Sequence, residues 1–327
     1  MTTNFWLFRR NGLQLIFFAL WACPCAAQDY PSKPIRIVDG FPPGGNTDFL
    51  SRTVAQKLIE NWGQPVIVDN RTGAAGNIAA ETVAKSAPDG YTLLMGLSSA
   101  LAPSMTLYPK LPYDLVRDFV PVGVVASSAL VLFVHSSVPV KSIKELIALA
   151  KARPGELNYA SCGIGCNTHL AAEALKLRAR INIVNVTYKG GAPATASVVS
   201  GESQLAFGSL ATSLGLIKAG KLRAIAVSGP RRSKALPEVP TIAESGYPGF
   251  DITSWYGLLA PAATPAAVIS KLNAELARIF STPAVIQRLA AVELDPMTAP
   301  PDEFGAIIKK EIVFYANLIK NAGIKAE

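Results

Sequence analysis

Two stretches of the sequence place glycines between a predicted strand and a predicted helix. The first reads GFPPGGNTD from Gly40 to Asp48, and the second reads CGIGCNTH from Cys162 to His169. Glycine lets backbone N–H groups approach a bound group closely. The first N–H groups of a helix have no partner within the helix and lie at the positive end of its dipole. Each stretch can therefore hold a phosphate or a carboxylate, although either one alone can also be a tight turn before an ordinary helix cap.

The sequence lacks the signatures of other common sites. Neither glycine turn ends in the Lys-Ser or Lys-Thr pair of a P-loop, and neither matches G-x-G-x-x-G; GAAGNI at 73–78 is a third, weaker glycine turn. No G-x-S-x-G motif marks a serine hydrolase. The two histidines, His135 and His169, lie far apart, and a C-x₃-C pair does not make a zinc site. We therefore expect no catalytic residue, no metal and no cofactor.

Composition and charge favour a folded protein with an anionic small-molecule partner. Of the 327 residues, 50% are hydrophobic and 17% are charged, which excludes wholesale disorder. The formal net charge is +8, or +6 without the two arginines of the first 27 residues. Basic residues are spread along the chain with no interleaved aromatic residues, so we expect no nucleic-acid partner.

The first 27 residues have the order of a secretory signal peptide. Arg9 and Arg10 precede the apolar run 13–22, which is too short to span a bilayer comfortably, and small residues at 25–27 come before Gln28. We expect cleavage before Gln28 and a periplasmic product; a lipid anchor at Cys23 is the alternative. Cleavage leaves Cys162 and Cys166 as the two cysteines of the mature chain, which an oxidising compartment leaves free to pair. A bridge and two free thiols both remain open at this point.

Strands and helices alternate behind the glycine turns. Predicted strands at 34–38, 66–69 and 91–96 are interleaved with predicted helices at 47–62 and 76–87. From about Ala129 a second series begins, with strands at 130–134, 157–161, 182–188, 203–208 and 222–227 and helices at 142–152, 168–179, 192–200 and 210–220. A strand at 254–261 and two or three terminal helices between 265 and 323 follow.

This alternation predicts an α/β protein of two lobes, each a mostly parallel sheet flanked by helices. If the terminal helices cover the first sheet, the first lobe is discontinuous. We expect a signal peptide at 1–27, a first lobe formed by 28–126 plus 251–327, and a second lobe formed by 127–250. Ligands of such sheets bind at the carboxyl ends of the strands. The two glycine turns can then face one cleft and hold a carboxylate from both sides.

Nearly the whole mature chain resembles a known family, the substrate-binding receptors of tripartite tricarboxylate transporters, or Bug receptors of Gram-negative bacteria. The resemblance rests on segments in a fixed order: GFPPGGNTD, VDNRTGAAGNIAAETVAKSAPDGYTLL, LYPKLPYDLVRDFVPV, PGELNYASCGIGCNTHLAAE, VTYKGGAPA, KLRAIAVSGPRRSKALPEVPTIAESGYPGF and WYGLLAPAATP. It implies a type II periplasmic binding protein of the Venus flytrap kind, which closes on a small carboxylate.

In receptors of that family both glycine loops grip one carboxylate of the ligand, largely through backbone groups and ordered water. Matched by motif, the expected contacts of the first loop are Phe41, Pro43, Gly44, Gly45 and Asp48. Those of the second loop are Ser161, Gly163, Gly165, Asn167 and His169. Ser98, after the strand at 91–96, and Phe207 with Ser209, after the strand at 203–208, are expected to line the variable end of the ligand.

Several of these residues have a structural alternative. Asp48 can hold its own loop rather than meet an anion, Phe41 can serve packing alone, and His169 can pack on a helix surface. Trp255 and Tyr256 are expected to pack between lobes or in the core.

Two positions depart from the family pattern. Cys166 stands where Ser or Thr is usual, so one hydroxyl contact is in doubt. Asp39 stands at an apolar strand end, and we expect it to point away and cap a backbone group. Valine at Gly45 or Gly165 is expected to fill the ligand's approach and to oppose any positive φ.

The resemblance implies a solute receptor that delivers its ligand to the membrane subunits of a tripartite tricarboxylate transporter, and we expect it to act as a monomer. A periplasmic sensor subunit, which would bind the same ligands and pass a signal to a signalling protein, is the alternative. No activated nucleophile or acid–base pair supports an enzyme. The sequence does not distinguish a dicarboxylate from an amino acid or an aromatic acid as ligand.

Overall fold

The structure, a computed structural model, describes residues 30–325. Its strands are β1 (Ile35–Asp39), β2 (Val66–Asn70), β3 (Thr92–Leu97), β4 (Phe119–His135), β5 (Asn158–Ser161), β6 (Val184–Thr187), β7 (Leu205–Ser209), β8 (Leu222–Val227), β9 (Thr253–Pro261) and β10 (Asp295–Pro296). The α-helices are α1 (Asn46–Trp62), α2 (Asn77–Ala84), α3 (Ser98–Leu107), α4 (Ile143–Ala152), α5 (Asn167–Ala179), α6 (Gly191–Val199), α7 (Leu210–Lys218), α8 (Ala266–Phe280), α9 (Pro283–Ala291) and α10 (Pro301–Ala322). A 3₁₀ turn, η1 (Ala74–Gly76), precedes α2.

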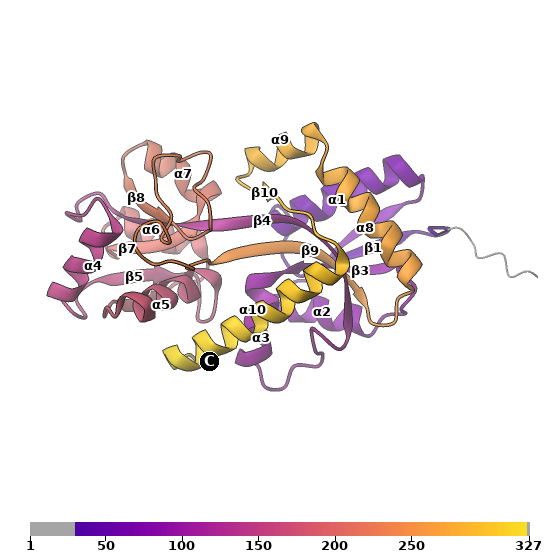
Figure 1. The fold of residues 1–327 in the computed structure, drawn as a ribbon, viewed down its shortest axis with the longest axis horizontal. Coiled ribbons are helices and arrows are strands. Elements are labelled where there is room, and N and C mark those ends of the chain that lie inside the picture. The colour runs from indigo at the N-terminus through magenta and orange to yellow at the C-terminus, as the bar shows by residue number, and fades with distance from the viewer. Residues whose placement is uncertain (1–29, 326–327) are drawn as a thin grey trace, which may run out of the picture.

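The strands form two groups that share β4. In the first group β1 lies between β2 and β3 and is parallel to both, while β9 pairs antiparallel with β3 and β4. In the second group β5 lies between β6 and β7 and is parallel to both, while β7 and β8 pair antiparallel with β4. Figure 1 shows the two groups as separate lobes with β4 and β9 running between them. The fold is the two-lobed α/β architecture that the alternation of strands and helices predicts.

Each sheet is covered on both faces by helices, as its buried strands require. In the first lobe α1, α8 and α9 pack on one face around Ile37 and Leu272, and α2, α3 and α10 pack on the other around Leu94 and Phe304. In the second lobe α4 and α5 cover one face, and α6 and α7 cover the other. Parallel strands buried on both faces read as near-continuous apolar runs, which is the pattern of these sequences.

Helix α10 belongs to both lobes. Phe304 and Ile308, in its first half, pack in the core of the first lobe. Tyr315, Leu318 and Ile319, in its second half, pack in the core of the second lobe. Figure 1 shows the helix lying across the two groups of strands.

Two parts of the fold differ from the sequence-based expectation. β4 is a single strand of 17 residues, so the predicted lobe boundary at 126/127 falls inside it, and the boundary at 250/251 falls just before β9. The ten-residue helix α3 was not expected, because Pro103 inside it is a helix-breaking signal. The predicted signal peptide lies outside the described residues, and within residues 30–325 no helix is long and apolar enough to cross a membrane.

Candidate functional site: two glycine loops at the ends of parallel strands

The two glycine loops have the same local structure. GGNTD at 44–48 and GCNTH at 165–169 each lead from the first strand of a parallel trio into a helix, α1 or α5. Gly44 and Gly165, the first residue of each motif, have φ of 89° and 74°. The next residues, Gly45 and Cys166, are the N-caps of α1 and α5, with extended backbone angles of −81°/174° and −72°/164°. The repeated motif thus sets one backbone geometry at two places in the fold.

The N-cap residue of neither helix bonds the first N–H groups with its side chain, and in α5 the Thr168 N–H donates to the side-chain oxygen of the neighbouring Asn167 at 2.9 Å. A Ser, Thr, Asp or Asn at the N-cap commonly accepts a hydrogen bond from one of these N–H groups. The N-caps here are Gly45 and Cys166, and neither makes such a bond. The N-cap positions therefore leave room at the positive end of each helix dipole for an anion or another acceptor.

The last residue of each motif holds the glycine that begins it. The Asp48 carboxylate accepts from the Gly44 N–H at 3.0 Å, and the His169 Nδ1 accepts from the Gly165 N–H at 3.0 Å. An acid and an imidazole thus perform the same task four residues after a glycine of positive φ. Both side chains position their loops, and their ligand contacts stay predictions.

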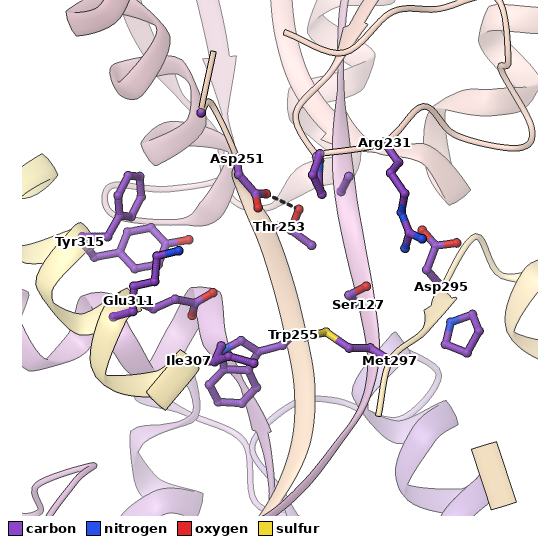
Figure 2. A pocket seen from close by; sticks show the side chains of 17 residues that line it. Ser127, Arg231, Asp251, Thr253, Trp255, Asp295, Met297, Ile307, Glu311 and Tyr315 are labelled. Carbon is purple, nitrogen blue, oxygen red and sulfur yellow. Dashed lines mark hydrogen bonds between the residues drawn. The ribbon is translucent and has the colours of Figure 1, made fainter. Parts of the chain in front are cut away.

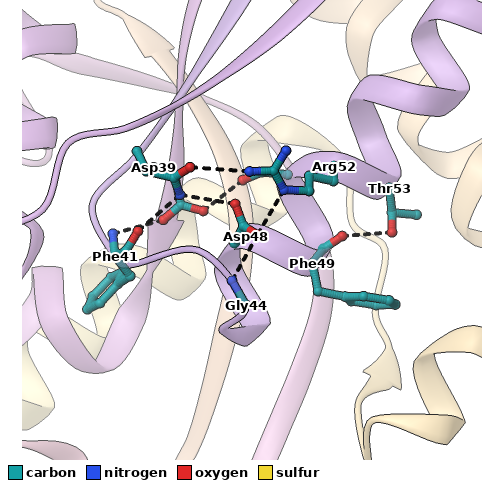
Figure 3. Close-up of polar contacts among 9 residues, drawn as sticks. Asp39, Phe41, Gly44, Asp48, Phe49, Arg52 and Thr53 are labelled. Atoms are coloured by element: carbon teal, nitrogen blue, oxygen red, sulfur yellow. Dashed lines mark hydrogen bonds and ion pairs between the residues drawn. The ribbon is translucent and has the colours of Figure 1, made fainter.

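The Asp48 carboxylate is surrounded by donors. Besides Gly44 it accepts from Arg52 Nε at 2.9 Å and from Asn70 Nδ2 at 3.0 Å (Figure 3). These bonds, with that from Arg52 the strongest, hold the pKa of Asp48 below its usual range. Because its oxygens already face three donors, Asp48 stabilises the loop and adds little repulsion toward an incoming anion.

His169 is buried inside the second lobe. Its side chain is 5% exposed and its ring stacks on Tyr159 at a centroid distance of 6.3 Å. Burial lowers the pKa of His169, so the neutral imidazole, with its proton on Nε2, is the form that can accept from Gly165.

The strand end before the first loop carries the unusual acid Asp39. Its fully buried carboxyl group accepts from the Phe41 N–H at 3.0 Å and from the Ser51 hydroxyl at 2.9 Å (Figure 3). Burial is the main cause that raises its pKa. Asp39 thus caps a backbone group inside the loop, as expected, and does not face the ligand approach.

The remaining first-loop residues differ in exposure. Pro43, Gly44 and Gly45 are exposed, whereas Phe41 is half-buried. A Cβ at Gly76 would lie 3.4 Å from the Phe41 ring, so this ring covers the third glycine turn. Gly40 and Gly76 touch so closely that a Cβ on Gly40 would come 2.6 Å from the Gly76 Cα, which explains both glycines.

The other predicted ligand residues of the second lobe also differ in exposure. Gly163 and Asn167 are half-buried, and Ser209, the N-cap of α7, is half-buried as well. Ser161 is fully buried, and its hydroxyl has no hydrogen-bond partner. Phe207 is 2% exposed inside the core of the second lobe.

Ser98 belongs to the first lobe, where it begins α3. It is fully buried, and its hydroxyl accepts from the Trp255 backbone N–H at 3.1 Å. The ligand roles of Ser98, Phe207 and Ser161 stay predictions, since in this arrangement of the lobes all three side chains are covered.

Cys162 and Cys166 are joined as a disulfide, with Cα atoms 6.2 Å apart. The bridge closes the loop around Gly163 and Gly165. The Cys162 N–H also donates to the Thr168 hydroxyl at 3.0 Å. The second loop is therefore held at both ends, by the bridge and by the first turn of α5.

The second loop touches the first lobe directly. A Cβ at Gly165 would come 2.5 Å from Cδ1 of Leu107, the last residue of α3. At Gly45, by contrast, the nearest atom is the Pro42 carbonyl oxygen at 3.7 Å, and φ is negative. The expected positive φ is therefore present at Gly165 and absent at Gly45. In the first loop the glycine of positive φ is Gly44.

The structure adds a polar cluster that the sequence did not suggest as part of the site. Asn46, the first residue of α1, donates from Nδ2 to the Tyr256 hydroxyl at 3.4 Å, and the Ser128 hydroxyl lies 3.2 Å from the same oxygen. Tyr256 and Ser128 come from the hinge strands β9 and β4. Nothing in a linear pattern marks a pair 210 residues apart, so no signal could have found this contact.

Among the pockets within residues 30–325 are two of about 450 and 250 Å³. Both are lined by the hinge strand β4 and by the segments around Arg231 and Asp295. Neither contains a residue of the glycine loops.

Comparison with known proteins places this site in a family. The family model described as the tripartite tricarboxylate transporter family receptor matches residues 50–324. The protein BugT of Bordetella pertussis is 39% identical over 305 residues, covering 93% of this chain and 94% of that protein. An R. palustris protein solved with adipate is 36% identical with a TM-score of 0.79, over 91% of this chain and 99% of that one.

MatC from Rhodopseudomonas palustris, solved with bound malate, is 28% identical with a TM-score of 0.74, over 89% of this chain and 100% of that one. The residues that the family model matches include both lobes, the hinge strands and the second glycine loop. The chain belongs to the tripartite tricarboxylate transporter receptor family, whose members are periplasmic solute-binding proteins.

Proposed function

We propose that the protein captures a small carboxylate between its lobes, with one carboxylate group held by the N-termini of α1 and α5, and delivers it to the membrane subunits of a tripartite tricarboxylate transporter. The observation that carries the proposal is the pair of helix N-termini whose N-cap residues, Gly45 and Cys166, form no side-chain cap bond and follow a glycine of positive φ. Backbone N–H groups at a helix start suit an anion because they donate and lie at the positive end of the dipole.

The relatives support the ligand class. Two proteins of the same fold, with 36% and 28% identity to this chain, were solved with adipate and malate, which are dicarboxylates. We expect a ligand of similar size, and a screen should compare dicarboxylates with amino acids and aromatic acids. We also propose that the protein acts as a monomer and reaches the periplasm by cleavage before Gln28.

The test uses a substitution that the fold tolerates. Gly45→Val places a branched side chain in front of the α1 N-terminus, where the backbone angle suits any residue and the nearest atom to the added Cβ is 3.7 Å away. In the parent, a ligand at a hundredfold excess over Kd stabilises the folded state by about 2.7 kcal/mol. Gly45→Val should unfold near the parent's temperature without ligand and lose this ligand-induced shift.

Gly215→Val is the matched control. Gly215 is an exposed residue of α7 with open space around its Cβ direction, away from both loops. This variant should keep the full ligand-induced shift. If Gly45→Val folds and binds a carboxylate as tightly as the parent and Gly215→Val do, α1 does not form the site and the two-loop proposal fails.

A further inference from the structure

The 450 Å³ pocket lies on the face of the hinge strands that carries Trp255. Its volume is about 450 Å³, within the range of small-molecule sites. Figure 2 shows Ser127 and Trp255 on its floor, α10 with Glu311 and Tyr315 on one side, and Arg231 with Asp295 on the other. The first glycine loop contacts the opposite face of the hinge strands. Asn46 of α1 contacts Tyr256, which follows Trp255 in β9, and the Tyr256 side chain packs on the face of the sheet that α1 covers.

Both lobes contribute walls to this pocket, which we call the hinge pocket. Arg231 follows β8, the last strand of the second lobe, and Asp251 lies just before β9. Met297 and Ile307 pack against the core of the first lobe. A movement of one lobe relative to the other must therefore change the pocket's shape. Any occupant is linked to the open–closed equilibrium, because it fits one arrangement better than the other.

Two buried polar atoms of this pocket's lining residues have no hydrogen-bond partner. They are Nε1 of Trp255, whose side chain is only 2% exposed, and Oε2 of Glu311. Burial raises the pKa of Glu311 to about 8, while hydrogen-bonding interactions with the Ser98 and Trp255 side chains lower it. The indole N–H and the carboxyl group therefore interact, but their geometry falls short of a well-formed hydrogen bond. Unpaired buried polar groups are rare in folded proteins and ask for an explanation.

The charges around the hinge pocket balance. Arg231 and Lys310 on the exposed rim are opposed by Asp251 and Asp295, which are also exposed. Glu311 adds little charge near neutral pH because it is mostly protonated there. The walls between these groups are apolar or aromatic: Trp255, Met297, Ile307, Phe314 and Tyr315. A net anion, the class that suits the glycine loops, gains nothing from this surface.

We propose that the hinge pocket is a second binding site, for an uncharged small molecule with an apolar body and one amide or hydroxyl group. Such a group both accepts and donates, so it can pair with the Trp255 N–H and with the Glu311 carboxyl group once these two side chains turn so that the covered atoms face the cavity. The apolar body lies against the aromatic walls. Occupancy of this site shifts the lobe equilibrium and thereby the affinity of the carboxylate cleft.

Benzamide and benzoate form a matched pair of probes. They share ring and size, but benzamide is neutral with a carbonyl acceptor and an N–H donor, whereas benzoate is an anion. Titration calorimetry on the mature Gly45→Val variant separates this pocket from the cleft, because that variant is expected to lose carboxylate binding. Benzamide should bind to it at about the parent's affinity, and benzoate should bind at least about tenfold more weakly than benzamide.

Three variants locate the binding. Glu311→Leu removes the carboxyl group, and Trp255→Phe removes the indole N–H; each should weaken benzamide binding by about tenfold. Glu311→Gln keeps a donor and an acceptor and should bind nearly as the parent does. Glu303→Gln, an exposed change near the start of the same helix, is the control and should change nothing.

Each outcome supports or overturns the second site. The proposal is overturned if benzamide does not bind at millimolar concentration, if benzoate binds Gly45→Val as well as benzamide does, or if Glu311→Leu and Trp255→Phe both bind benzamide like the parent. Loss of benzamide binding in Gly45→Val would place the probe in the carboxylate cleft and also overturn it. If benzamide binding follows the pattern above while carboxylates fail to bind any variant or the parent, the hinge pocket stands and the proposed cleft function falls.

Discussion

Three loop glycines allow a graded test of the loop geometry, because the structure gives each a different reason to be glycine. Gly45 has φ of −81° and free space, Gly44 has φ of +89° and free space, and Gly165 has φ of +74° with Leu107 Cδ1 only 2.5 Å from where a Cβ would lie. Alanine therefore meets no obstacle at Gly45, backbone strain at Gly44, and strain plus a clash at Gly165.

The expected losses of unfolding free energy follow from these differences. Gly45→Ala should change stability by less than about 0.5 kcal/mol, because a poorer N-cap is offset by a less flexible unfolded chain. Gly44→Ala should cost about 1 kcal/mol for the left-handed conformation. Gly165→Ala should cost about 2–4 kcal/mol, since overpacking against Leu107 adds to the same strain.

A double-mutant cycle separates the two contributions at Gly165. Leu107→Ala removes the atom that the new methyl group would meet, so Gly165→Ala should cost only about 1 kcal/mol in that background. The coupling of about 1–3 kcal/mol is the measure of contact between the second loop and α3. Urea denaturation of the mature proteins, followed by circular dichroism, gives all the values. Equal costs at all three glycines, or no coupling between Gly165 and Leu107, would refute the loop geometry described above.

Three further predictions concern the hinge and the cysteines. The pKa of Glu311 is about 8 in the folded state against 4.5 ordinarily, so the folded state binds this proton more tightly than the unfolded chain does. The protonated Glu311 therefore stabilises the folded state fully below pH 4.5. This stabilisation is lost as pH rises toward 8, by up to on the order of 5 kcal/mol. Denaturation at several pH values should show Glu311→Gln gaining on the parent over that window, and a constant difference would contradict the burial of this acid. Thiol labelling of the unreduced, denatured mature protein should find Cys162 and Cys166 unreactive; two reactive thiols would mean that the bridge does not form. The intact mass of the secreted protein should begin at Gln28, whereas a lipid-bearing mass beginning at Cys23 would rule out simple cleavage.

Much of the fold follows from local patterns in the sequence. Apolar runs between turn residues mark the parallel strands, and apolar spacings of three and four mark α1, α4, α5, α8 and α10. The two glycine motifs mark where strands β1 and β5 end and helices begin. Asp39 also behaves as the sequence suggested, since a buried acid needs donors and the nearest are the Phe41 N–H and the Ser51 hydroxyl.

Other features had no reliable local signal. Helix α3 was not predicted, and Pro103 inside it is a signal against a helix. Proline is tolerated in a helix where the fold supplies hydrogen bonds to the neighbouring backbone groups. The first half of β4 was missed, because Pro121 and Gly123 interrupt the apolar run and the strand has irregular pairing there. That the His169 ring accepts from the Gly165 N–H had no local signal either, because it depends on how Tyr159 and the core orient the imidazole; the ligand contact of His169 stays a prediction.

The sequence by itself determined the repeated strand–glycine–helix units, the two-lobed α/β class and the family, because each depends on residue types a few positions apart. Only the tertiary structure decided which distant groups meet. Asn46 reaches Tyr256 across 210 positions, Gly165 packs on Leu107 of the other lobe, and Glu311 is buried beside Trp255. Burial and pairing of this kind depend on how the helices and sheets of two lobes pack against each other, and side-chain order along one helix or strand does not specify that packing.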